Sequence, residues 1–407
     1  MERIVVVGGG LAGLRAAETL RRREFTGALT VVGDEPHEPY NRPPLSKQFL
    51  AGAFDERKCA FRVSPDLDVE WRLGTRAVGL DLGAREVALD DGRALPFDGL
   101  MIATGCTARD WPGVPLPPAR NVFLLRSIDD SRALRAAAER AERVVILGAG
   151  FIGMEVAATF RSQGREVDVV DIAPFPLRPL GREVGELCRT LHEERGVRFH
   201  MDELVHGFTA DGERLTGVGL RDGRELPCDL LLVATGSAPN VGWLEGSGLQ
   251  LRPAVVCDAC CLAVGTEGVA AAGDVAQWPH PLAGGDVVAV EHWSNAAEMA
   301  IAAAGNLIAA PEARRPYTTV PSFWSDQYDV KVQSVGFPAR AERIHVLEGS
   351  LEERRFVAAC ERDERVVGAI MWNMARRMPA YRRLIEDGPT LDELRRRVDE
   401  AAPRPAR

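Results

Sequence analysis

The sequence predicts an α/β protein with two nucleotide-binding domains and a mixed α+β domain at the C-terminal end. Three observations support this prediction. A glycine-rich turn joins an apolar run to an alanine-rich run within residues 4–20, the same pattern returns within residues 144–158, and short β-rich runs begin at residue 318. Buried strands that alternate with helices are typical of parallel sheets covered by helices.

The first glycine-rich turn has the pattern of a dinucleotide grip. Residues 4–7 predict a buried strand, and the glycines within residues 8–13 lead into a helix over residues 14–20. Such a turn lets the backbone approach a pyrophosphate at the helix N-terminus, where free amide groups and the helix dipole favour negative charge. A second strand, residues 29–33, is followed by Asp34 and Glu35, where an acid is required to bond a ribose hydroxyl.

The chain then repeats this Rossmann-like unit. A second apolar run at 144–147 leads into the glycines of residues 148–153, and the next strand ends at Asp171, about 20 residues further on. The strand end Ala103-Thr104-Gly105 has a counterpart in Ala234-Thr235-Gly236. Two such units predict two nucleotide sites.

The acid at the end of the second unit bears on nucleotide choice. A carboxylate pairs with a ribose 2′-hydroxyl and repels a 2′-phosphate, so Asp171 favours NAD over NADP. Arg178 lies close enough in the sequence to weaken that preference.

Composition excludes several classes of protein. A chain of 407 residues can form two or three domains, and a net charge of −9 argues against general nucleic-acid binding. The first residues run directly into a strand without a signal peptide, and no apolar run is long enough to span a bilayer, so we expect a cytoplasmic protein. Eight scattered cysteines suit reduced thiols better than a disulfide framework.

Proline-rich and β-rich stretches indicate the domain boundaries. The stretch Trp111–Pro118 breaks all regularity, and the pattern changes again near Thr318. We expect residues 1–112 and 245–317 to form the first nucleotide-binding domain, residues 113–244 the second, and residues 318–407 the C-terminal domain.

Four further motifs accompany the two glycine-rich units. They are Arg42-Pro43-Pro44-Leu45-Ser46-Lys47, Gly273-Asp274, Glu291-His292-Trp293 and Phe323-Trp324-Ser325-Asp326-Gln327-Tyr328. With them, the chain resembles the FAD-dependent NADH:ferredoxin reductase family of oxygenase systems, which includes the putidaredoxin, rhodocoxin and biphenyl dioxygenase reductases. The resemblance covers nearly the full length. It implies a glutathione-reductase-like fold with FAD and NAD(H) as cofactors.

The resemblance implies an FAD site in the first domain. The FAD pyrophosphate is expected on Gly8, Gly10, Leu11, Ala12 and Gly13, and the adenosine ribose on Asp34 with Glu35 beside it. Other expected FAD contacts are Arg42 and Arg126 at the phosphates, Val78 at the adenine, the strand end Ala103, Thr104 and Gly105, Gly273 with Asp274 at the ribitol chain, His292 as a packing residue, and Trp293 and Trp324 near the flavin ring.

The resemblance also implies an NADH site and the catalytic residues. NADH is expected along Gly148, Gly150, Gly153 and Asp171, with Gly236 at the matching strand end and the nicotinamide near Glu155 and Glu291. Lys47 is expected close to flavin N5 and paired with Glu155. The resemblance further implies hydride transfer from NADH to FAD, and then single-electron transfer to a small, acidic iron–sulfur ferredoxin that serves a haem monooxygenase or a ring-hydroxylating dioxygenase.

Several alternatives stay open or are weakened at this stage. Residues 36–58 and 107–187 contain no cysteine, which argues against a reductase that works through a disulfide beside the flavin. Cys257-Asp258-Ala259-Cys260-Cys261 lacks the second ligand pair of a zinc site, and the seven histidines lack metal-binding spacing, so no metal is expected. An NADH oxidase and a flavin-bound signalling protein of the same fold are the remaining functional alternatives.

Basic clusters near the C-terminal end suggest a docking surface for the acidic ferredoxin. They are Arg376-Arg377, Arg382-Arg383 and Arg395-Arg396-Arg397. Charge steering of an acidic partner is one interpretation. A solvated helix face is the other, and it is favoured for the last cluster.

Overall fold

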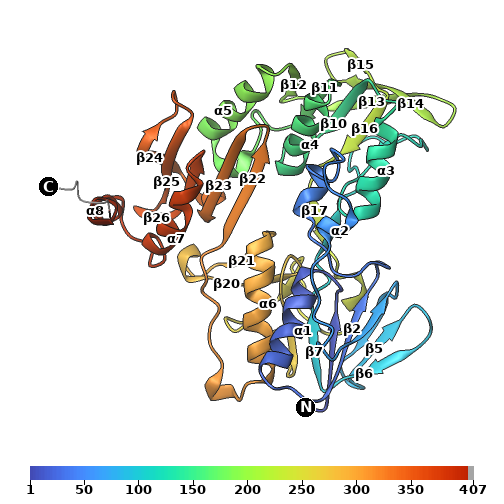
Figure 1. Ribbon diagram of the computed structural model, residues 1–407, viewed down its shortest axis with the longest axis vertical. Helices are drawn as coiled ribbons and strands as arrows, with labels where there is room; N and C mark the ends of the chain where they lie inside the picture. The colour runs from blue at the N-terminus through green and yellow to red at the C-terminus, as the bar shows by residue number, and fades with distance from the viewer. Residues whose placement is uncertain (402–407) are drawn as a thin grey trace. The chain divides into compact units, whose positions relative to one another are not determined.

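The computed structural model describes residues 1–401 and divides into two compact units. The first unit contains Met1–Asn41, Ala60–Thr107 and Ala238–Phe323. The second unit contains Arg42–Cys59, Ala108–Ser237 and residues 324–401. Each unit therefore combines segments that are distant in sequence, as the colours of Figure 1 show.

A five-stranded parallel sheet forms the centre of the first unit. Its strand order is β19-β7-β1-β2-β3, and all neighbours pair in parallel. β1 is the middle strand, and its residues 4–7 are buried on both faces, which explains the continuous apolar run there. The strands are β1 (Arg3–Val7), β2 (Ala28–Gly33), β3 (Glu70–Leu73), β7 (Gly99–Ile102) and β19 (Val269–Ala271).

Two helices and two smaller sheets complete the first unit. Helices α1 (Leu11–Arg22) and α6 (Trp293–Ile308) pack against each other, and both bury small or aliphatic side chains. The small sheets consist of β4 (Ala77–Asp81), β5 (Glu86–Leu89) and β6 (Ala94–Pro96), and of β18 (Val255–Val256), β20 (Ala276–Pro279) and β21 (Val287–Ala289).

The second unit repeats the parallel sheet. Its strand order is β12-β11-β10-β16-β9, and each of these strands pairs in parallel with its neighbours. The strands are β9 (Val122–Phe123), β10 (Arg143–Leu147), β11 (Glu166–Asp171), β12 (Val197–Met201) and β16 (Leu230–Val233), and the helices are α2 (Glu56–Cys59), α3 (Ile128–Ala138), α4 (Phe151–Ser162) and α5 (Arg182–Glu193).

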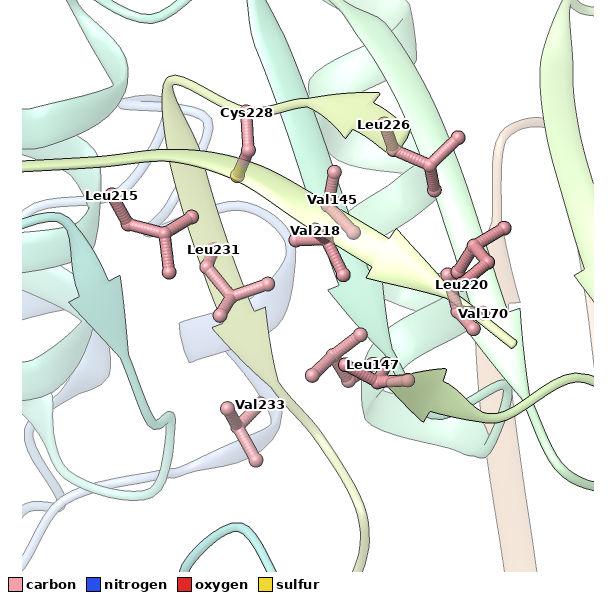
Figure 2. Close-up of a cluster of buried hydrophobic side chains, with 11 residues drawn as sticks. Val145, Leu147, Val170, Leu215, Val218, Leu220, Leu226, Cys228, Leu231 and Val233 are labelled. Atoms are coloured by element: carbon pink, nitrogen blue, oxygen red, sulfur yellow. The ribbon is translucent and has the colours of Figure 1, made fainter. Parts of the chain in front are cut away.

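An antiparallel meander covers one face of this second sheet. It consists of β13 (Val205–Asp211), β14 (Arg214–Leu220) and β15 (Glu225–Pro227). Figure 2 shows the core between them, to which alternate residues of β10 and β16 contribute Val145, Leu147, Leu231 and Val233. The period of two places these side chains on one face, so the same strands present their other residues to the helices.

The C-terminal part of the second unit contains a five-stranded sheet of order β22-β23-β26-β25-β24. The pairs of β23 with β26, β26 with β25, and β25 with β24 are antiparallel. Phe356 and Trp372 stack in its core with ring centroids 6.2 Å apart. The elements are β22 (Ser322–Gln327), β23 (Val330–Gly336), β24 (Arg343–Ser350), β25 (Arg355–Arg362), β26 (Arg365–Trp372), α7 (Met378–Leu384) and α8 (Leu391–Ala401).

Two short strands and seven 3-10 turns complete the described elements. The strands are β8 (Cys106–Ala108) and β17 (Ser237–Pro239). The turns are Pro43–Ser46, Arg178–Leu180, Gly242–Leu244, Pro281–Ala283, Pro311–Ala313, Pro338–Arg340 and Ala375–Arg377. None of the helices within residues 1–401 is both long enough and apolar enough to cross a membrane.

The predicted α/β class and both repeated units are confirmed, and the differences are small. The first C-terminal strand, expected from residue 318, begins at Ser322. Pro321 precedes it and cannot donate a ladder hydrogen bond, which explains the later start. The alanine-rich run that follows Glu291-His292 forms the helix α6, which ends at Ile308.

Candidate functional site

The first cradle, residues 8–13, has a backbone that requires glycine at two positions. Gly8 has φ +126°, and its amide donates to the carbonyl oxygen of Val32 at 2.7 Å. A Cβ at Gly8 would overlap the carbonyl oxygen of Ala103, and a Cβ at Gly13 would overlap the carbonyl oxygen of Gly8. The cradle therefore brings β1, β7 and α1 into close contact, which only glycine permits.

Gly10 has a different reason to be glycine. It is the N-cap of α1, and its side of the turn is open, with no heavy atom within 4 Å of a Cβ placed there. No side chain caps this helix. The first amide groups of a helix have no partner within it, so those of Leu11, Ala12 and Gly13 are suited to an anion that approaches over Gly10.

The second cradle, residues 148–153, repeats these features. Gly148 has φ +111°, and a Cβ there would overlap the carbonyl oxygen of Ala234, the counterpart of Ala103. A Cβ at Gly153 would overlap the carbonyl oxygen of Gly148. Gly150 is the N-cap of α4, again without a side-chain cap and with open space in front of it. Each unit thus fits one dinucleotide pyrophosphate.

The acids that follow the two cradles are held differently. In the second unit, both carboxylate oxygens of Asp171 accept backbone amides, Oδ2 from Ala149 at 2.6 Å and Oδ1 from Ala173 at 2.7 Å. In the first unit, Asp34 is exposed, and Glu35 accepts a hydrogen bond from the Tyr40 hydroxyl at 2.5 Å. The second acid is therefore fixed against its cradle, whereas Asp34 lies exposed to solvent.

Gly273 and Asp274 lie beside the first turn of α1. A Cβ at Gly273, whose φ is +79°, would be 3.3 Å from the Cβ of Ala12. Asp274 accepts a hydrogen bond from the Cys106 thiol at 3.3 Å. The neighbouring strand end is held by Thr104, whose hydroxyl donates to the carbonyl oxygen of Asn240 at 2.8 Å. In the first unit, the cradle therefore lies close to Gly273, Asp274 and this strand end.

His292 adds a buried polar atom to this region. It is the N-cap residue of α6, and its Nδ1 atom is buried without a hydrogen-bond partner among the described residues. Burial lowers the pKa of His292 to about 4, although the charge of Asp274 opposes this shift. The next residue, Trp293, donates from Nε1 to Asn41 at 2.8 Å. A neutral imidazole with a free nitrogen fits a site that binds a polar cofactor.

The matching strand end of the second unit has a similar orphaned atom. The hydroxyl of Thr235 is buried and has no partner among residues 1–401. The next residue, Gly236, has φ +111° and open space at its Cβ position. An unsatisfied hydroxyl beside the second cradle fits a polar ligand there.

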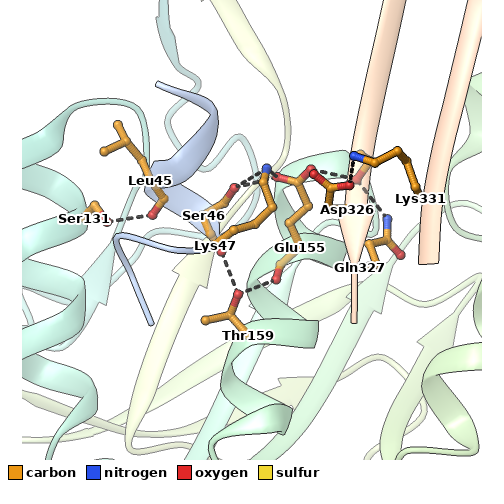
Figure 3. Close-up of polar contacts among 10 residues, drawn as sticks. Leu45, Ser46, Lys47, Ser131, Glu155, Thr159, Asp326, Gln327 and Lys331 are labelled. Atoms are coloured by element: carbon orange, nitrogen blue, oxygen red, sulfur yellow. Dashed lines mark hydrogen bonds and ion pairs between the residues drawn. The ribbon is translucent and has the colours of Figure 1, made fainter. Parts of the chain in front are cut away.

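The predicted pair of Lys47 and Glu155 is present in the second unit (Figure 3). Lys47 Nζ lies 2.6 Å from Glu155 Oε2, and the two side chains are only 11% and 7% exposed. Glu155 Oε2 also accepts from the Ser46 hydroxyl at 2.5 Å, and Oε1 accepts from the Ser325 hydroxyl at 2.7 Å. A buried pair persists only when hydrogen bonds satisfy its remaining oxygens, and here they do.

Sequence reasoning missed the partners that hold this pair. Ser46, Ser325 and Thr159 were not singled out, although the first two lie within the quoted motifs. Thr159, one helical turn after Glu155, donates to the carbonyl oxygens of Ser46 at 2.8 Å and Glu155 at 3.0 Å. A polar residue four positions after Glu155 on the same helix face was the available signal.

The remaining predicted residues occupy varied environments. The Arg42 guanidinium donates to the carbonyl oxygen of Arg126 at 2.9 Å, so the structure brings these two together. Val78 is exposed on β4, Glu291 is exposed before α6, and Trp324 is half-buried on β22.

The cysteine cluster does not have the character of a redox centre. Burial raises the pKa of Cys257 to about 12 and that of Cys261 well above its usual range. Both thiols therefore stay protonated at neutral pH, which makes them poor nucleophiles. No group of histidine, cysteine and acidic side chains in residues 1–401 could hold a metal ion.

Comparison with known proteins agrees with this geometry. The model of the pyridine nucleotide-disulphide oxidoreductase family matches residues 2–300, and that of the reductase C-terminal domain matches residues 322–403. The ferredoxin–NAD(+) reductase component of the anthranilate 1,2-dioxygenase system from Burkholderia cepacia is 36% identical over 396 residues, 95% of each chain. Rhodocoxin reductase from Rhodococcus erythropolis is 34% identical over 388 residues, 94% of this chain and 89% of that protein.

A solved structure gives the same result for the fold. Putidaredoxin reductase, in its covalent complex with putidaredoxin, aligns with a TM-score of 0.90 and 30% identity. The alignment covers 98% of this chain and 99% of that one. Because the family models together cover almost the whole sequence, this chain belongs to the pyridine nucleotide-disulphide oxidoreductase family and carries that family's reductase C-terminal domain.

Proposed function

We propose that this chain is the reductase component of an oxygenase system, which passes electrons from NADH through FAD to an iron–sulfur ferredoxin. FAD and NAD(H) are the cofactors that the family implies. The observation that supports the proposal most strongly is the pair of matching cradles, each with glycines against a strand end and an uncapped helix N-terminus. Two dinucleotides on one chain are what hydride transfer between them requires.

We assign FAD to the first cradle and NADH to the second. In the first unit, Gly10 leaves room for the pyrophosphate at α1, and the exposed Asp34, with Glu35 beside it, would bond the ribose. In the second unit, Asp171 presents a fixed carboxylate that would pair with a 2′-hydroxyl and repel a 2′-phosphate. The corresponding domains would be residues 1–112 with 245–317 for FAD and residues 113–244 for NAD.

Bound FAD supplies the chemistry, since it accepts a hydride and returns electrons one at a time. The protein supplies charge and orientation. Lys47 contributes a positive charge that would stabilise a reduced, negatively charged flavin, and Glu155 keeps that ammonium in place. Neither residue needs to move a proton for the hydride to transfer.

The partner is proposed from the relatives and from the C-terminal domain. The relatives include reductase components of dioxygenase systems, and putidaredoxin reductase is known in complex with putidaredoxin. The basic clusters are partly neutralised, because Arg377 pairs with Glu348 and Arg397 pairs with Asp387 at 2.6 Å. Arg376 and Arg383 are the better candidates for steering an acidic ferredoxin.

We also propose that the protein works in the cytoplasm. All eight cysteines are free thiols, which suits a reducing compartment.

Cytochrome c reduction with and without an added ferredoxin tests the proposed function. Under NADH, we expect cytochrome c reduction to depend strongly on the ferredoxin. Rapid oxygen consumption without ferredoxin, and no gain when it is added, would contradict the proposal and favour an NADH oxidase.

A further inference from the structure

A buried row of hydrogen bonds connects α5 with Glu155 through β22, all within the second unit. Figure 3 shows its inner end, with Glu155 and Gln327 labelled and the hydrogen bonds drawn as dashed lines. The members are His192 on α5, Gln327 and Ser325 on β22, and Glu155 on α4. His192, Gln327 and Ser325 are fully buried. Buried polar side chains are costly unless they are satisfied, so a complete row of this kind has a defined geometry.

The outer end of the row fixes the orientation of the Gln327 amide. Gln327 Oε1 accepts hydrogen bonds from the Cys188 thiol at 3.1 Å and from His192 Nε2 at 2.9 Å. Burial lowers the pKa of His192 to about 4, so the ring is neutral at physiological pH. With its hydrogen on Nε2, the ring can accept at Nδ1 from the Tyr328 hydroxyl, 3.4 Å away. The amide nitrogen of Gln327 must then face Ser325.

The inner end of the row directs a hydroxyl hydrogen at Glu155. Gln327 Nε2 donates to Ser325 Oγ at 3.3 Å, so Ser325 uses its own hydrogen for Glu155 Oε1 at 2.7 Å. The other oxygen, Oε2, faces Lys47 and Ser46. The two oxygens are thus held from opposite sides, one by the C-terminal domain and one by the loop that carries Lys47.

We propose that Ser325 and Gln327 are positioning residues, which hold the Glu155 carboxylate in the rotamer that pairs with the Lys47 ammonium. Without the Ser325 hydroxyl, Oε1 is a buried acceptor that lacks its donor, and the carboxylate turns to recover one. Lys47 then loses its fixed partner. The C-terminal domain would therefore hold the Lys47–Glu155 pair in place, in addition to any part it has in partner binding. The expected effect of this role on NADH oxidation rests on the proposed function.

The test compares Ser325→Ala with a conservative variant and a matched control in the FAD-loaded, full-length protein. Ser325→Thr keeps the hydroxyl. Asp326→Asn changes the next residue, which pairs with Lys331 and does not contact Glu155. The first readout is the ¹⁵N NMR signal of the Lys47 ammonium, identified by its loss in Lys47→Ala. We expect this signal in the wild type, Ser325→Thr and Asp326→Asn, and its loss in Ser325→Ala through faster hydrogen exchange.

The second readout is stopped-flow reduction by NADH. We expect the limiting rate of Ser325→Ala to fall by about tenfold, with an unchanged Kd for NADH. A change of about tenfold in rate corresponds to the free energy of one lost charge-assisted hydrogen bond. Gln327→Asn, whose shorter amide cannot reach both Ser325 and His192, should shift both readouts in the same direction. It keeps the test decisive if Ser325→Ala does not fold.

Two results would overturn the inference. One is a wild-type Lys47 signal together with a wild-type limiting rate in Ser325→Ala. The other is a wild-type result for both readouts in Gln327→Asn. A wild-type protein that NADH does not reduce would instead contradict the proposed function, and the Lys47 ammonium signal alone would then decide the positioning role.

Discussion

The ammonium nitrogen of Lys47 lies 2.6 Å from Oε2 of Glu155, although the two residues come from a proline-rich loop and from helix α4 of the second unit. Both side chains are buried. Burial of two charges costs free energy that only good geometry and further hydrogen bonds recover. The pair is therefore a sensitive part of the second unit, and removal of one partner should have a larger effect than removal of both.

We expect Glu155→Gln to lower the melting temperature of the FAD-loaded protein clearly. The substitution leaves the Lys47 ammonium buried without its countercharge, which typically costs about 3–5 kcal/mol. Differential scanning calorimetry of the wild type and the variant measures the effect.

The double variant Lys47→Met/Glu155→Gln is the control for this result. It removes both charges, so its destabilisation should be smaller than the sum of the two single substitutions. If the destabilisation of the double variant equals the sum for Lys47→Met and Glu155→Gln, the two side chains do not interact in solution.

Gly150→Ala should weaken NADH binding and leave the fold intact. A Cβ at this position meets no protein atom within 4 Å, and it would occupy the approach to the uncapped N-terminus of α4. We expect the Kd for NADH to rise by at least tenfold, with an unchanged FAD content and melting temperature.

Gly207→Ala, on β13, serves as the matched control because its Cβ position is also open. It should bind NADH like the wild type. Equal NADH affinities for the two variants would argue against the second cradle as the nicotinamide nucleotide site.

Asp171→Asn should narrow the preference for NADH over NADPH. The wild-type carboxylate lies against the cradle amide of Ala149 and would repel a 2′-phosphate. We expect kcat/KM for NADH to fall by about tenfold and the ratio of the two nucleotides to move towards one. Steady-state assays with both nucleotides measure this ratio, and an unchanged ratio would remove Asp171 from the specificity determinants.

The buried His192 should make the free energy of unfolding depend on pH. Burial lowers its pKa to about 4 in the folded protein, compared with 6.5 for a free histidine. Between pH 6.5 and pH 4, His192 binds a proton in the unfolded chain but not in the folded chain. The contribution of His192 to the free energy of unfolding is therefore complete above pH 6.5 and is lost as the pH falls towards 4. The full effect is of the order of 3 kcal/mol.

His192→Gln should flatten the pH dependence of the unfolding free energy between pH 6.5 and 4. His206→Gln, at an exposed position on β13, is the control and should retain the wild-type slope. Denaturant melts at several pH values provide the measurement. Parallel slopes for the wild type and His192→Gln would mean that His192 is not buried as a neutral ring.

Local patterns in the sequence predicted the fold well, because the relevant information is local. The apolar runs of β1 and β10, followed by Gly8 and Gly148, specify strand, turn and helix within about 20 residues. The β-rich C-terminal region was also predicted, since its strands are separate β-rich runs between turns.

The partners of Glu155 could not be predicted in the same way. Ser325 is 170 positions from Glu155, and its hydrogen bond depends on how the C-terminal sheet packs against α4. Serine is also common at exposed positions, so its residue type gives no signal of a buried role. The resemblance predicted the Lys47–Glu155 pair and the structure confirms that pair, whereas the catalytic roles of both residues remain predictions.

An anaerobic titration of the purified protein with NADH, followed by absorbance, tests the central claim most directly. If the two cradles bind FAD and NADH, the purified protein is yellow, and its flavin absorbance bleaches as about one equivalent of NADH is added. A colourless protein, or one that stays yellow under NADH, would contradict the assignment of FAD and NADH to the two cradles.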